Sequence, residues 1–529
     1  MNKIKGLTIL LLLLITFPTL GQNQNVSNGN VFDGEPYLAI NPNNDQHIVV
    51  AWMGWINFSN QIKIKVKTSF DGGLTWSVVS ELPHTVNGYS SADPSIAFNT
   101  NGDVFVCYID FTGTAPPVVG GVYICKSVDG GLTFNPPMEV INTSYDGTKW
   151  PIDRPWLAID NSSGPHQGNI YVTSMNLNRT NAPFNPYLSV SSDGGNTFIT
   201  SYLDATGWLA GSLNPLPMCS PTVSATGVFY GVYPSFVLSQ SLYSQAFLVK
   251  STDGGLSFTH STVLTANPPS NIGDYPSAKK GPLLITNPAN SSHLAYVFLS
   301  AVNGDLDVFF TETFNAGVSW SSPLRINDDP VGNNRMQDLL WADFDTDGDL
   351  IISWRDRRNG TDSSYQTQSE IWASFRNKDA LQFEPNFQIT NQTVAYDTIL
   401  ESAGNDFMCI KLQNDILSAA WGDTRNEKLN IWFQRLTTDG TVLAVQQISS
   451  EDIPVIFVYP NPTLSLLFVE GENIKEISIY DLNGRVIISQ QNNTAENKIE
   501  INMEEYPIGN YVIKVETING TFTNKIIKQ

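Results

Sequence analysis

Short runs of alternating apolar and polar residues fill most of the chain, and turns rich in glycine, asparagine and aspartate separate them. The runs are rich in β-branched and aromatic residues, as in "HIVVAWMGW" from residue 47 and "VFVCYID" from residue 104. Alternation of this kind predicts β-strands, and the turn residues between them predict hairpins. No stretch of the sequence has the apolar spacing of an amphipathic helix. We therefore expect an all-β protein.

One short motif recurs along the chain at a nearly constant interval. Its copies are "SFDGGLTW" at 69–76, "SVDGGLTF" at 127–134, "SSDGGNTF" at 191–198, "STDGGLSF" at 251–258 and the decayed "TFNAGVSW" at 313–320. With Asp379 and Asp439 as the last two equivalents, the steps are 58 to 64 residues. A second hairpin, such as "EPYLAINPNNDQHIVVAWMGW" from residue 35, lies between the copies. Four antiparallel strands per repeat predict a β-propeller. We expect seven blades over roughly 30–450, or six if a terminal unit is not a full blade.

The residue types of the motif suit a tight corner between two strands. Gly72 and Gly73 permit positive φ, the Asp71 carboxylate can accept hydrogen bonds across the turn, and Trp76 can pack between sheets. We therefore expect Asp71, Asp129, Asp193 and Asp253 to be structural. The four intact copies resemble the Asp boxes, or BNR repeats, of the sialidase superfamily. That superfamily includes sialidases, xyloglucan hydrolases, sorting receptors and photosystem assembly factors, so the resemblance implies a fold and not one activity.

The strand order within a unit puts the Asp boxes and any binding site on opposite faces. In an up-and-down blade with strands A to D, the A–B and C–D turns share one face, and the B–C and D–A connections share the other. The Asp boxes are C–D turns, so a pocket at the channel mouth must lie on the opposite face. The residues before strand A are Glu35, Asp93, Asp153 with Arg154, Lys279 with Lys280, Arg335 with Asp338, and Asp406. Those near the end of strand B include Trp52, Trp55, Asp110, Asn176, the run Arg355 to Arg358, and Asp423 with Arg425.

Arginines and carboxylates gather at this rim although the chain has only 29 Lys and Arg residues. Guanidinium groups bind planar anions through paired hydrogen bonds, and carboxylates serve acid and base chemistry. The expected substrate-binding residues are Arg154, Arg335, Arg355, Arg357, Arg425 and Trp52. The expected catalytic carboxylates are Asp153, Asp338 and Asp356. Interblade salt bridges and arginines stacked on tryptophan are the alternative interpretation of these residues.

The resemblance to sialidases implies a more specific chemistry at the rim. In sialidases three arginines hold the substrate carboxylate, an aspartate is the acid/base, and a tyrosine activated by a glutamate is the nucleophile. Arg154, Arg335 and one of Arg355, Arg357 or Arg425 would supply the arginines, and Tyr396 with Glu401 is the nearest Tyr/Glu pair in sequence. The Phe-Arg-Ile-Pro motif that supplies the first arginine in sialidases is absent, because the equivalent stretch reads "EPYLAI".

Three functions therefore remain open. They are a sialidase-like glycoside hydrolase acting on extracellular glycans, a non-catalytic propeller that binds glycans or proteins, and an inverting hydrolase of neutral glycans with two carboxylates.

Charge and metal-ligating residues narrow the choice of partners. The formal charge of −21 and pI near 4.5 disfavour nucleic acid and anionic membranes as partners. Of the four cysteines, Cys107 and Cys125 could form a cross-strand bridge, although buried free thiols are favoured. No metal or cofactor is expected, since no Cys/His cluster occurs. The stretch "DFDTDGDL" from Asp343 to Leu350 resembles a calcium loop, but a plain turn is favoured because the distal glutamate is missing.

The two ends of the chain indicate export. Residues 1–21 combine Lys3 and Lys5 with the apolar run "LTILLLLLITF", which predicts a secretory signal peptide and no transmembrane segment. Residues 22–452 are the predicted propeller. Residues 453–529 contain "VYPNPT", "YDLNGRVI", "YPIGNYVIKV" and "NKIIKQ", and resemble the type A sorting domain of the Bacteroidetes type IX secretion system, with the fold of a small β-sandwich. The resemblance implies the secretion machinery as a partner and a location on the cell surface or in the medium, reached through the periplasm.

Overall fold

A computed structural model of the chain describes residues 23–55, 61–177, 180–214, 216–266, 281–395, 404–443, 456–481, 485–492, 496–517 and 521–529. These residues form β-strands and one 3₁₀ turn, η1 (Gly147–Lys149). The chain divides into two compact units, Met1–Leu443 and Ala444–Gln529. Within the described ranges, no helix has the length and apolar character needed to cross a membrane. The predicted signal peptide lies outside these residues.

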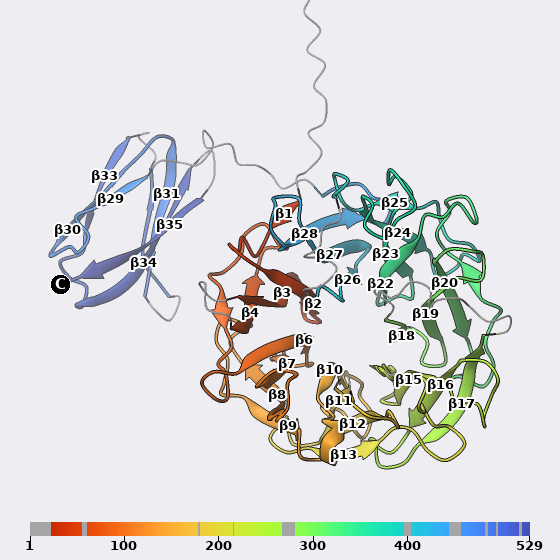
Figure 1. Cartoon of the computed structure of the whole chain (residues 1–529). Coiled ribbons are helices and arrows are strands. Elements are labelled where there is room, and N and C mark those ends of the chain that lie inside the picture. The colour runs from red at the N-terminus through yellow and green to blue at the C-terminus, as the bar shows by residue number, and fades with distance from the viewer. Residues whose placement is uncertain are drawn as a thin grey trace, which may run out of the picture. The chain divides into compact units, whose positions relative to one another are not determined.

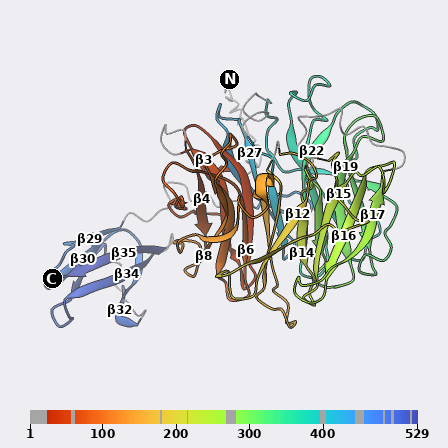
Figure 2. The same ribbon diagram turned by 60° about the horizontal axis from the view of Figure 1, so that its bottom comes forward.

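The first unit is a ring of seven four-stranded antiparallel sheets, which we number as blades 1 to 7 (Figures 1 and 2). Blade 1 contains β2 (Asp33–Asn41), β3 (Asn44–Trp55), β4 (Ile62–Ser69) and β5 (Ser80–Glu81), and blade 2 contains β6 (Ser90–Phe98), β7 (Val104–Phe111), β8 (Gly120–Ser127) and β9 (Met138–Asn142). Blade 3 contains β10 (Asp153–Ile159), β11 (Ile170–Met175), β12 (Pro186–Ser191) and β13 (Ile199–Tyr202), and blade 4 contains β14 (Ser220–Val223), β15 (Phe229–Ser235), β16 (Gln245–Ser251) and β17 (Thr259–Thr265). Blade 5 contains β18 (Leu283–Thr286), β19 (Leu294–Ser300), β20 (Asp307–Thr313) and β21 (Leu324–Arg325), and blade 6 contains β22 (Gln337–Phe344), β23 (Leu350–Asp356), β24 (Glu370–Arg376) and β25 (Phe387–Gln388). Blade 7 contains β26 (Cys409–Gln413), β27 (Ile416–Asp423), β28 (Asn430–Thr437) and β1 (Gln24–Asn25). The predicted all-β propeller is therefore confirmed, with seven blades.

The ring is closed by a strand from the beginning of the propeller. β1 pairs antiparallel with β28, so that Gln24 lies opposite Phe433 at the outer edge of blade 7 (Figure 1). The Val26 backbone N–H donates to the Ile431 carbonyl over 2.9 Å, and only 1% of Val26 is exposed. The sequence pattern did not reveal this strand, because two paired residues carry no periodic signal.

The Asp boxes form the same turn in four consecutive blades. In blade 1, Asp71 accepts hydrogen bonds from the Ser69 hydroxyl at 2.7 Å, the Thr75 N–H at 2.9 Å and the Thr75 hydroxyl at 2.5 Å. The Gly73 N–H donates to the Ser69 hydroxyl, and Gly72 and Gly73 have φ of +72° and +87°. Asp129, Asp193 and Asp253 accept equivalent bonds, and Asn315 replaces the aspartate in blade 5. The motif is thus a self-contained hydrogen-bonded corner.

Replacing Asp71 by alanine is expected to lower the free energy of unfolding by about 1 kcal/mol, because three donors lose their acceptor near the surface. Burial tends to raise the pKa of Asp71, but hydrogen bonds from Thr75 and Ser69 outweigh it and hold the pKa below its usual value. Asp71→Asn is the matched control and should cost less, since Asn315 already forms this turn. Thermal unfolding of the full chain measures both changes. An equal loss for both variants would contradict this account.

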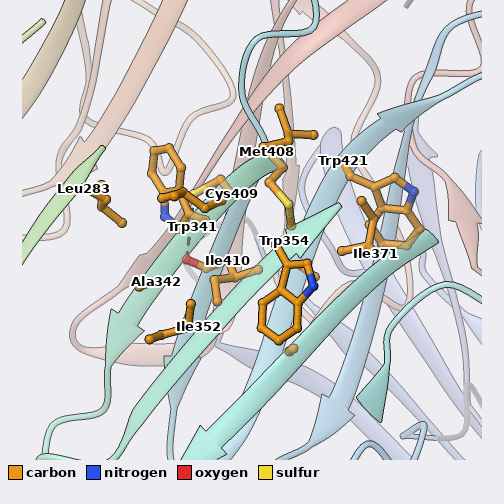
Figure 3. Close-up of a cluster of buried hydrophobic side chains, with 14 of the residues drawn as sticks. Leu283, Trp341, Ala342, Ile352, Trp354, Ile371, Met408, Cys409, Ile410 and Trp421 are labelled. Atoms are coloured by element: carbon orange, nitrogen blue, oxygen red, sulfur yellow. Dashed lines mark hydrogen bonds between the residues drawn. The ribbon is translucent and has the colours of Figure 1, made fainter. Parts of the chain in front are cut away.

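The hydrophobic core lies between the blades and includes three buried tryptophans, Trp52, Trp354 and Trp421. Figure 3 shows Trp354 and Trp421 together with Trp341, Met408 and Cys409. All four cysteines, Cys107, Cys125, Cys219 and Cys409, are free and buried.

The second unit is a small sandwich of two antiparallel sheets, as the sequence predicts. Its strands are β29 (Phe457–Tyr459), β30 (Leu466–Glu470), β31 (Ile474–Tyr480), β32 (Val486–Gln491), β33 (Lys498–Asn502), β34 (Gly509–Thr517) and β35 (Thr521–Lys528). One sheet has the order β29-β30-β33 and the other β32-β31-β34-β35. Alternate residues such as Leu467, Ile477 and Ile513 are fully buried between them.

Candidate active site at the channel mouth

The innermost strands of the propeller start at the face opposite to the Asp boxes. The Gly72 N–H of the blade 1 box donates to the Gln46 carbonyl in the β2–β3 region, so boxes and A–B turns share one face. The strands β2, β6, β10, β18, β22 and β26 border the centre of the ring (Figure 1). Their first residues therefore surround the channel mouth on the other face, as the strand order predicts.

The backbone is irregular at the starts of these strands, where side chains lie at the channel mouth. The pairing of β2, β6, β10 and β22 with the next strand shifts register near its start, as in a β-bulge. Within these shifts, Glu35, Asp93, Arg154 and Leu339 have φ between +49° and +55°, and Asn405, just before β26, has φ of +60°. Left-handed backbone is uncommon for such residues and tends to occur at functional sites.

Four charged side chains from blades 1, 2, 3 and 7 meet there, and we call Glu35, Asp93, Arg154 and Asp406 the mouth cluster. Arg154 Nη2 lies 2.7 Å from an Asp406 carboxylate oxygen. The Arg154 N–H donates to Asp93 over 3.2 Å, and the Asp406 N–H donates to Glu35 over 3.3 Å. The Arg154–Asp406 pair joins blades 3 and 7, whose residues are 252 positions apart in sequence. The cluster thus bridges blades that are not neighbours.

Glu35 is the buried member of the mouth cluster, with 3% of its surface exposed. Burial raises the pKa of Glu35 well above its usual value, and the nearby Asp93 and Asp406 carboxylates raise it further. Glu35 thus combines deep burial with two nearby carboxylates, an environment that favours its protonated form.

Arg154 carries the positive charge of the cluster. Burial acts to lower the pKa of Arg154, but Asp406, Asp153 and Asp93 outweigh it and raise the pKa. About a fifth of each side chain of the Arg154–Asp406 pair is exposed, at 20% and 22%. The Arg154 guanidinium lies 5.6 Å from the centre of the Phe407 ring. The open side of the cluster is thus formed by Arg154 and Asp406, with Glu35 more deeply buried.

Aromatic side chains fill the channel next to the mouth cluster. Trp156 packs on Phe407 at 5.6 Å and on Trp341 at 5.7 Å between ring centres, and Tyr37 meets Trp341 at 5.0 Å. These four residues come from blades 3, 7, 6 and 1. A molecule at the mouth would therefore meet an apolar, dry floor, where electrostatic interactions are stronger than in water.

The structure brings two predicted arginines together on one predicted carboxylate. Asp338 is fully buried and accepts from Arg355 Nε and Nη2, both at 2.7 Å, and from Arg357 Nη1 at 3.0 Å. The Tyr365 hydroxyl lies 3.1 Å from Asp338 and 2.9 Å from Arg355. Asp338 thereby accepts hydrogen bonds from both guanidinium groups within blade 6.

Two other predicted residues belong to a motif that repeats in blades 6 and 7. In blade 6 the Trp354 indole N–H donates to Asp356 over 2.6 Å, and Arg358 caps the same carboxylate at 2.9 Å. Blade 7 repeats this with Trp421, Asp423 and Arg425, at 2.8 Å and 2.6 Å. The Arg358 guanidinium also lies over the Trp372 ring, 4.1 Å from its centre, and the Arg425 guanidinium lies over the Trp432 ring at 4.4 Å. Burial raises the pKa of Asp356.

The remaining predicted residues lie in three separate places. Arg335 donates to the Asp362 carbonyl. Trp52 is 1% exposed, and its indole donates to Asp33 over 2.7 Å. Asp153 is buried at the start of β10, beside Arg154. Tyr396, Glu401, Lys279 and Lys280 lie outside the described residues.

Glu35, Asp93 and Asp406 were placed at the rim by the sequence but not nominated for chemistry. Their only signal was the position just before strand A, because the sequence does not reveal that they meet across the ring.

The acidic stretch that resembles a calcium loop bonds to neighbouring protein groups. Asp345 accepts from the backbone N–H groups of Asn414 and Asp415, and Asp347 pairs with Lys378. Across the described ranges, no three His, Cys, Asp or Glu side chains gather in a group able to hold a metal ion.

Residues 457–529 match the secretion system C-terminal sorting domain. The protein is therefore exported to the cell surface or released from it, and its C-terminal unit is the part that the secretion machinery reads. No curated protein matches the chain.

Several solved structures are similar to the chain at low identity. An α-L-arabinofuranosidase of Fusarium graminearum is 13% identical over 68% of this chain and 97% of its own, with a TM-score of 0.43. The NanB sialidase of Streptococcus pneumoniae is 12% identical over 80% and 72%, with a TM-score of 0.39. A Dyadobacter fermentans protein of unknown function is 15% identical over 63% and 94%, with a TM-score of 0.41. Likenesses this distant carry no activity over to this chain.

Proposed function

We propose that the propeller is a glycoside hydrolase that acts on extracellular glycans at the channel mouth, with Glu35 as the general acid. The observation that carries the proposal is the buried Glu35 carboxyl beside the Asp93 and Asp406 carboxylates, where burial and these neighbours raise its pKa. Glycoside hydrolysis needs one carboxyl group that holds a proton and a second that is ionised. The sorting domain supports an extracellular substrate.

The mouth cluster assigns each step of hydrolysis to a side chain. Glu35 gives its proton to the leaving glycosidic oxygen as the bond from that oxygen to the anomeric carbon breaks. Asp406 takes a proton from a water molecule, whose oxygen bonds to the anomeric carbon. Arg154 holds Asp406 ionised and in place through their 2.7 Å contact. The proton on Asp406 later returns to Glu35 through solvent, which restores both groups.

The charge of the site favours a neutral sugar. Asp93, Asp153 and Asp406 surround the single Arg154 guanidinium, so the cluster has a net negative charge that repels a carboxylate substrate. Arg355 and Arg357 do not belong to this cluster, and both pair with Asp338 in blade 6. The third hypothesis from the sequence, a hydrolase of neutral glycans, is thus the one that the geometry favours.

A sialidase-like activity is the second candidate, favoured by the guanidinium pair beside Tyr365. Arg355 and Arg357 lie 5.8 Å and 4.4 Å from the centre of the Tyr365 ring. To bind a sialic acid carboxylate, this pair would have to exchange Asp338 for the substrate.

The test is turnover of two sets of chromogenic substrates by the purified full chain. Aryl glycosides of neutral pentoses and hexoses form one set, and an aryl sialoside forms the other. Release of the aryl group from a neutral glycoside supports the first candidate, and release from the sialoside supports the second. If the protein binds any of these glycosides but turns over none of them, the remaining candidate is a non-catalytic, glycan-binding propeller.

The same assay gives a pH dependence that reports on Glu35. Because the acid must be protonated, activity should fall as pH rises through the elevated pKa of Glu35. Asp93→Asn removes a nearby negative charge, so this loss should move to lower pH by about 1 unit. Asp379→Asn, an exposed carboxylate in the decayed motif of blade 6, is the control and should leave the profile in place. An unchanged profile in Asp93→Asn would contradict the assignment.

A further inference from the structure

A cavity of about 270 Å³ lies between blades 2 and 3 on the Asp-box face, away from the mouth cluster. It is lined by Asp103, Lys126, Gln167, Ser192 and Gly194, among other residues. The volume is close to that of about nine liquid water molecules. This is room for one sugar ring.

Two other blade junctions on this face are filled by aromatic side chains. In blade 1, the His47 ring stacks on Phe70 of its own Asp box at 4.6 Å between centres and meets Phe98 of the next blade at 5.0 Å. In blade 5, His293 stacks on Phe314 at 4.3 Å and meets Phe344 of the next blade at 5.0 Å. A histidine between two phenylalanines is therefore one way in which this fold closes the junction.

The junction of blades 2 and 3 has three smaller side chains at the same positions, two from blade 2 and one from blade 3. Strand pairing places Ile48, Val104 and Leu294 at equivalent positions, each opposite the first residue of its Asp box. The preceding residues, His47, Asp103 and His293, are thus equivalent. Val128 replaces the phenylalanine of the box, and Ile159 replaces the phenylalanine of the next blade. The cavity occupies the volume that the rings fill elsewhere.

The space beside the Asp-box glycines also differs between these junctions. A methyl group added at Gly130 would meet the His47 ring at 3.0 Å, and one added at Gly254 would meet His166 at 2.7 Å. At Gly194, the equivalent glycine of blade 3, no atom of the described residues lies within 4 Å. The opening thus distinguishes the junction of blades 2 and 3 from the junctions that follow blades 1 and 3.

The lining offers both hydrogen-bond donors and acceptors around an apolar floor. Lys126 pairs with Asp103 at 2.8 Å, and Asn99 donates to the same carboxylate at 3.0 Å, so the site carries no net charge. Within the part of the chain that the structure describes, the side-chain amides of Asn101 and Gln167 make no hydrogen bond. The floor consists of Phe105, Ile159 and Ile170, all buried.

We propose that this cavity binds one neutral, hydroxyl-rich ring, a monosaccharide unit of a glycan. Sugar hydroxyls both donate and accept hydrogen bonds, which matches the amides and the balanced Asp103–Lys126 pair. The C–H face of the ring packs on the apolar floor. Because the site lies on the face opposite to the mouth cluster, it holds a glycan without competing with hydrolysis, and it stands independently of that activity.

Saturation-transfer NMR with the full chain tests the proposal. The probes are methyl β-D-glucopyranoside, methyl β-D-galactopyranoside and methyl α-D-mannopyranoside, with dissociation constants expected on the order of millimolar for so few atoms. Ser192→Trp places an indole at the rim of the cavity, and Gln167→Ala removes an exposed amide; each should weaken binding at least about tenfold. Thr252→Trp is the matched control, at the same position of the blade 4 box, where His166 already fills the junction.

The outcomes separate the two faces of the propeller. Binding that is lost in Ser192→Trp but kept in Thr252→Trp and in Glu35→Gln supports the cavity. Saturation transfer from the wild-type chain to none of the three probes would overturn it. Binding that persists in Ser192→Trp, or that is lost only in Glu35→Gln, would place the sugar elsewhere and would also overturn it. Thermal unfolding of each variant confirms that the loss is local.

Discussion

Glu35→Gln is expected to lower kcat/KM for glycoside hydrolysis by roughly 10²- to 10⁴-fold, the usual contribution of a general acid. Glutamine has nearly the same shape and can still donate to Asp93 and accept from the Asp406 N–H. It cannot release a proton to the leaving oxygen. The loss should therefore appear in kcat, with KM little changed, and should be greatest for substrates with poor leaving groups. Initial rates on two aryl glycosides of different leaving-group acidity measure this.

Glu370→Gln is the matched control, since Glu370 is also a buried glutamate and is 4% exposed on β24. Its carboxylate accepts from Trp372 and Asn359 within blade 6, which contributes no residue to the mouth cluster. Activity of this variant should stay near that of the wild type at temperatures below its unfolding transition. If Glu35→Gln retained full activity on every substrate, the general-acid role would be wrong. Thermal unfolding of Glu35→Gln should change little, because the amide has nearly the size of the carboxyl and buries no charge.

Val26→Asp is expected to lower the free energy of unfolding by about 3–5 kcal/mol, because it buries an unpaired charge at the seam of the ring. Val26 is 1% exposed and follows directly on β1, whose hydrogen bonds hold β28. Loss of this contact should release the outer edge of blade 7. We expect a lower Tm and faster proteolysis between β27 and β28, measured by mass spectrometry of the first fragments.

Val78→Asp is the control for that experiment, since Val78 is 88% exposed after the blade 1 Asp box. Its Tm should match that of the wild type. If proteases first cut Val26→Asp in one of blades 2 to 5 and left blade 7 intact, β1 would not be the strand that closes the ring.

The propeller was predictable because its signals are local and repeated. A motif such as Ser69 to Trp76 determines its own turn, and seven spaced copies indicate the ring. The strand order also indicated which face to search, and the structure places Arg154 at that mouth, paired with Asp406. These inferences depend only on residues that are close together in the sequence.

The arrangement of the candidate site was not predictable, because it depends on contacts across the ring. Arg154 meets Asp406 from four blades further along the chain. The elevated pKa of Glu35 arises from burial and from Asp93 and Asp406, none of which adjoins it in sequence. The "WRDRR" run attracted attention for its charge, yet each of its three arginines pairs with Asp338 or Asp356 within blade 6. Composition alone did not distinguish an arginine that pairs with a carboxylate of the protein from one that could bind a ligand.

The seam between β1 and β28 also bears on how the protein leaves the cell. It joins Gln24 to Phe433, so nearly the whole propeller must have emerged before the last hydrogen bonds can form. Until then, the incomplete ring exposes two unpaired strand edges, which invite wrong pairing and proteolysis. A chain cut short anywhere before blade 7 never acquires its seam. Completion of the ring thus distinguishes finished molecules from fragments, and resistance to proteases outside the cell would be a property of the full-length product alone.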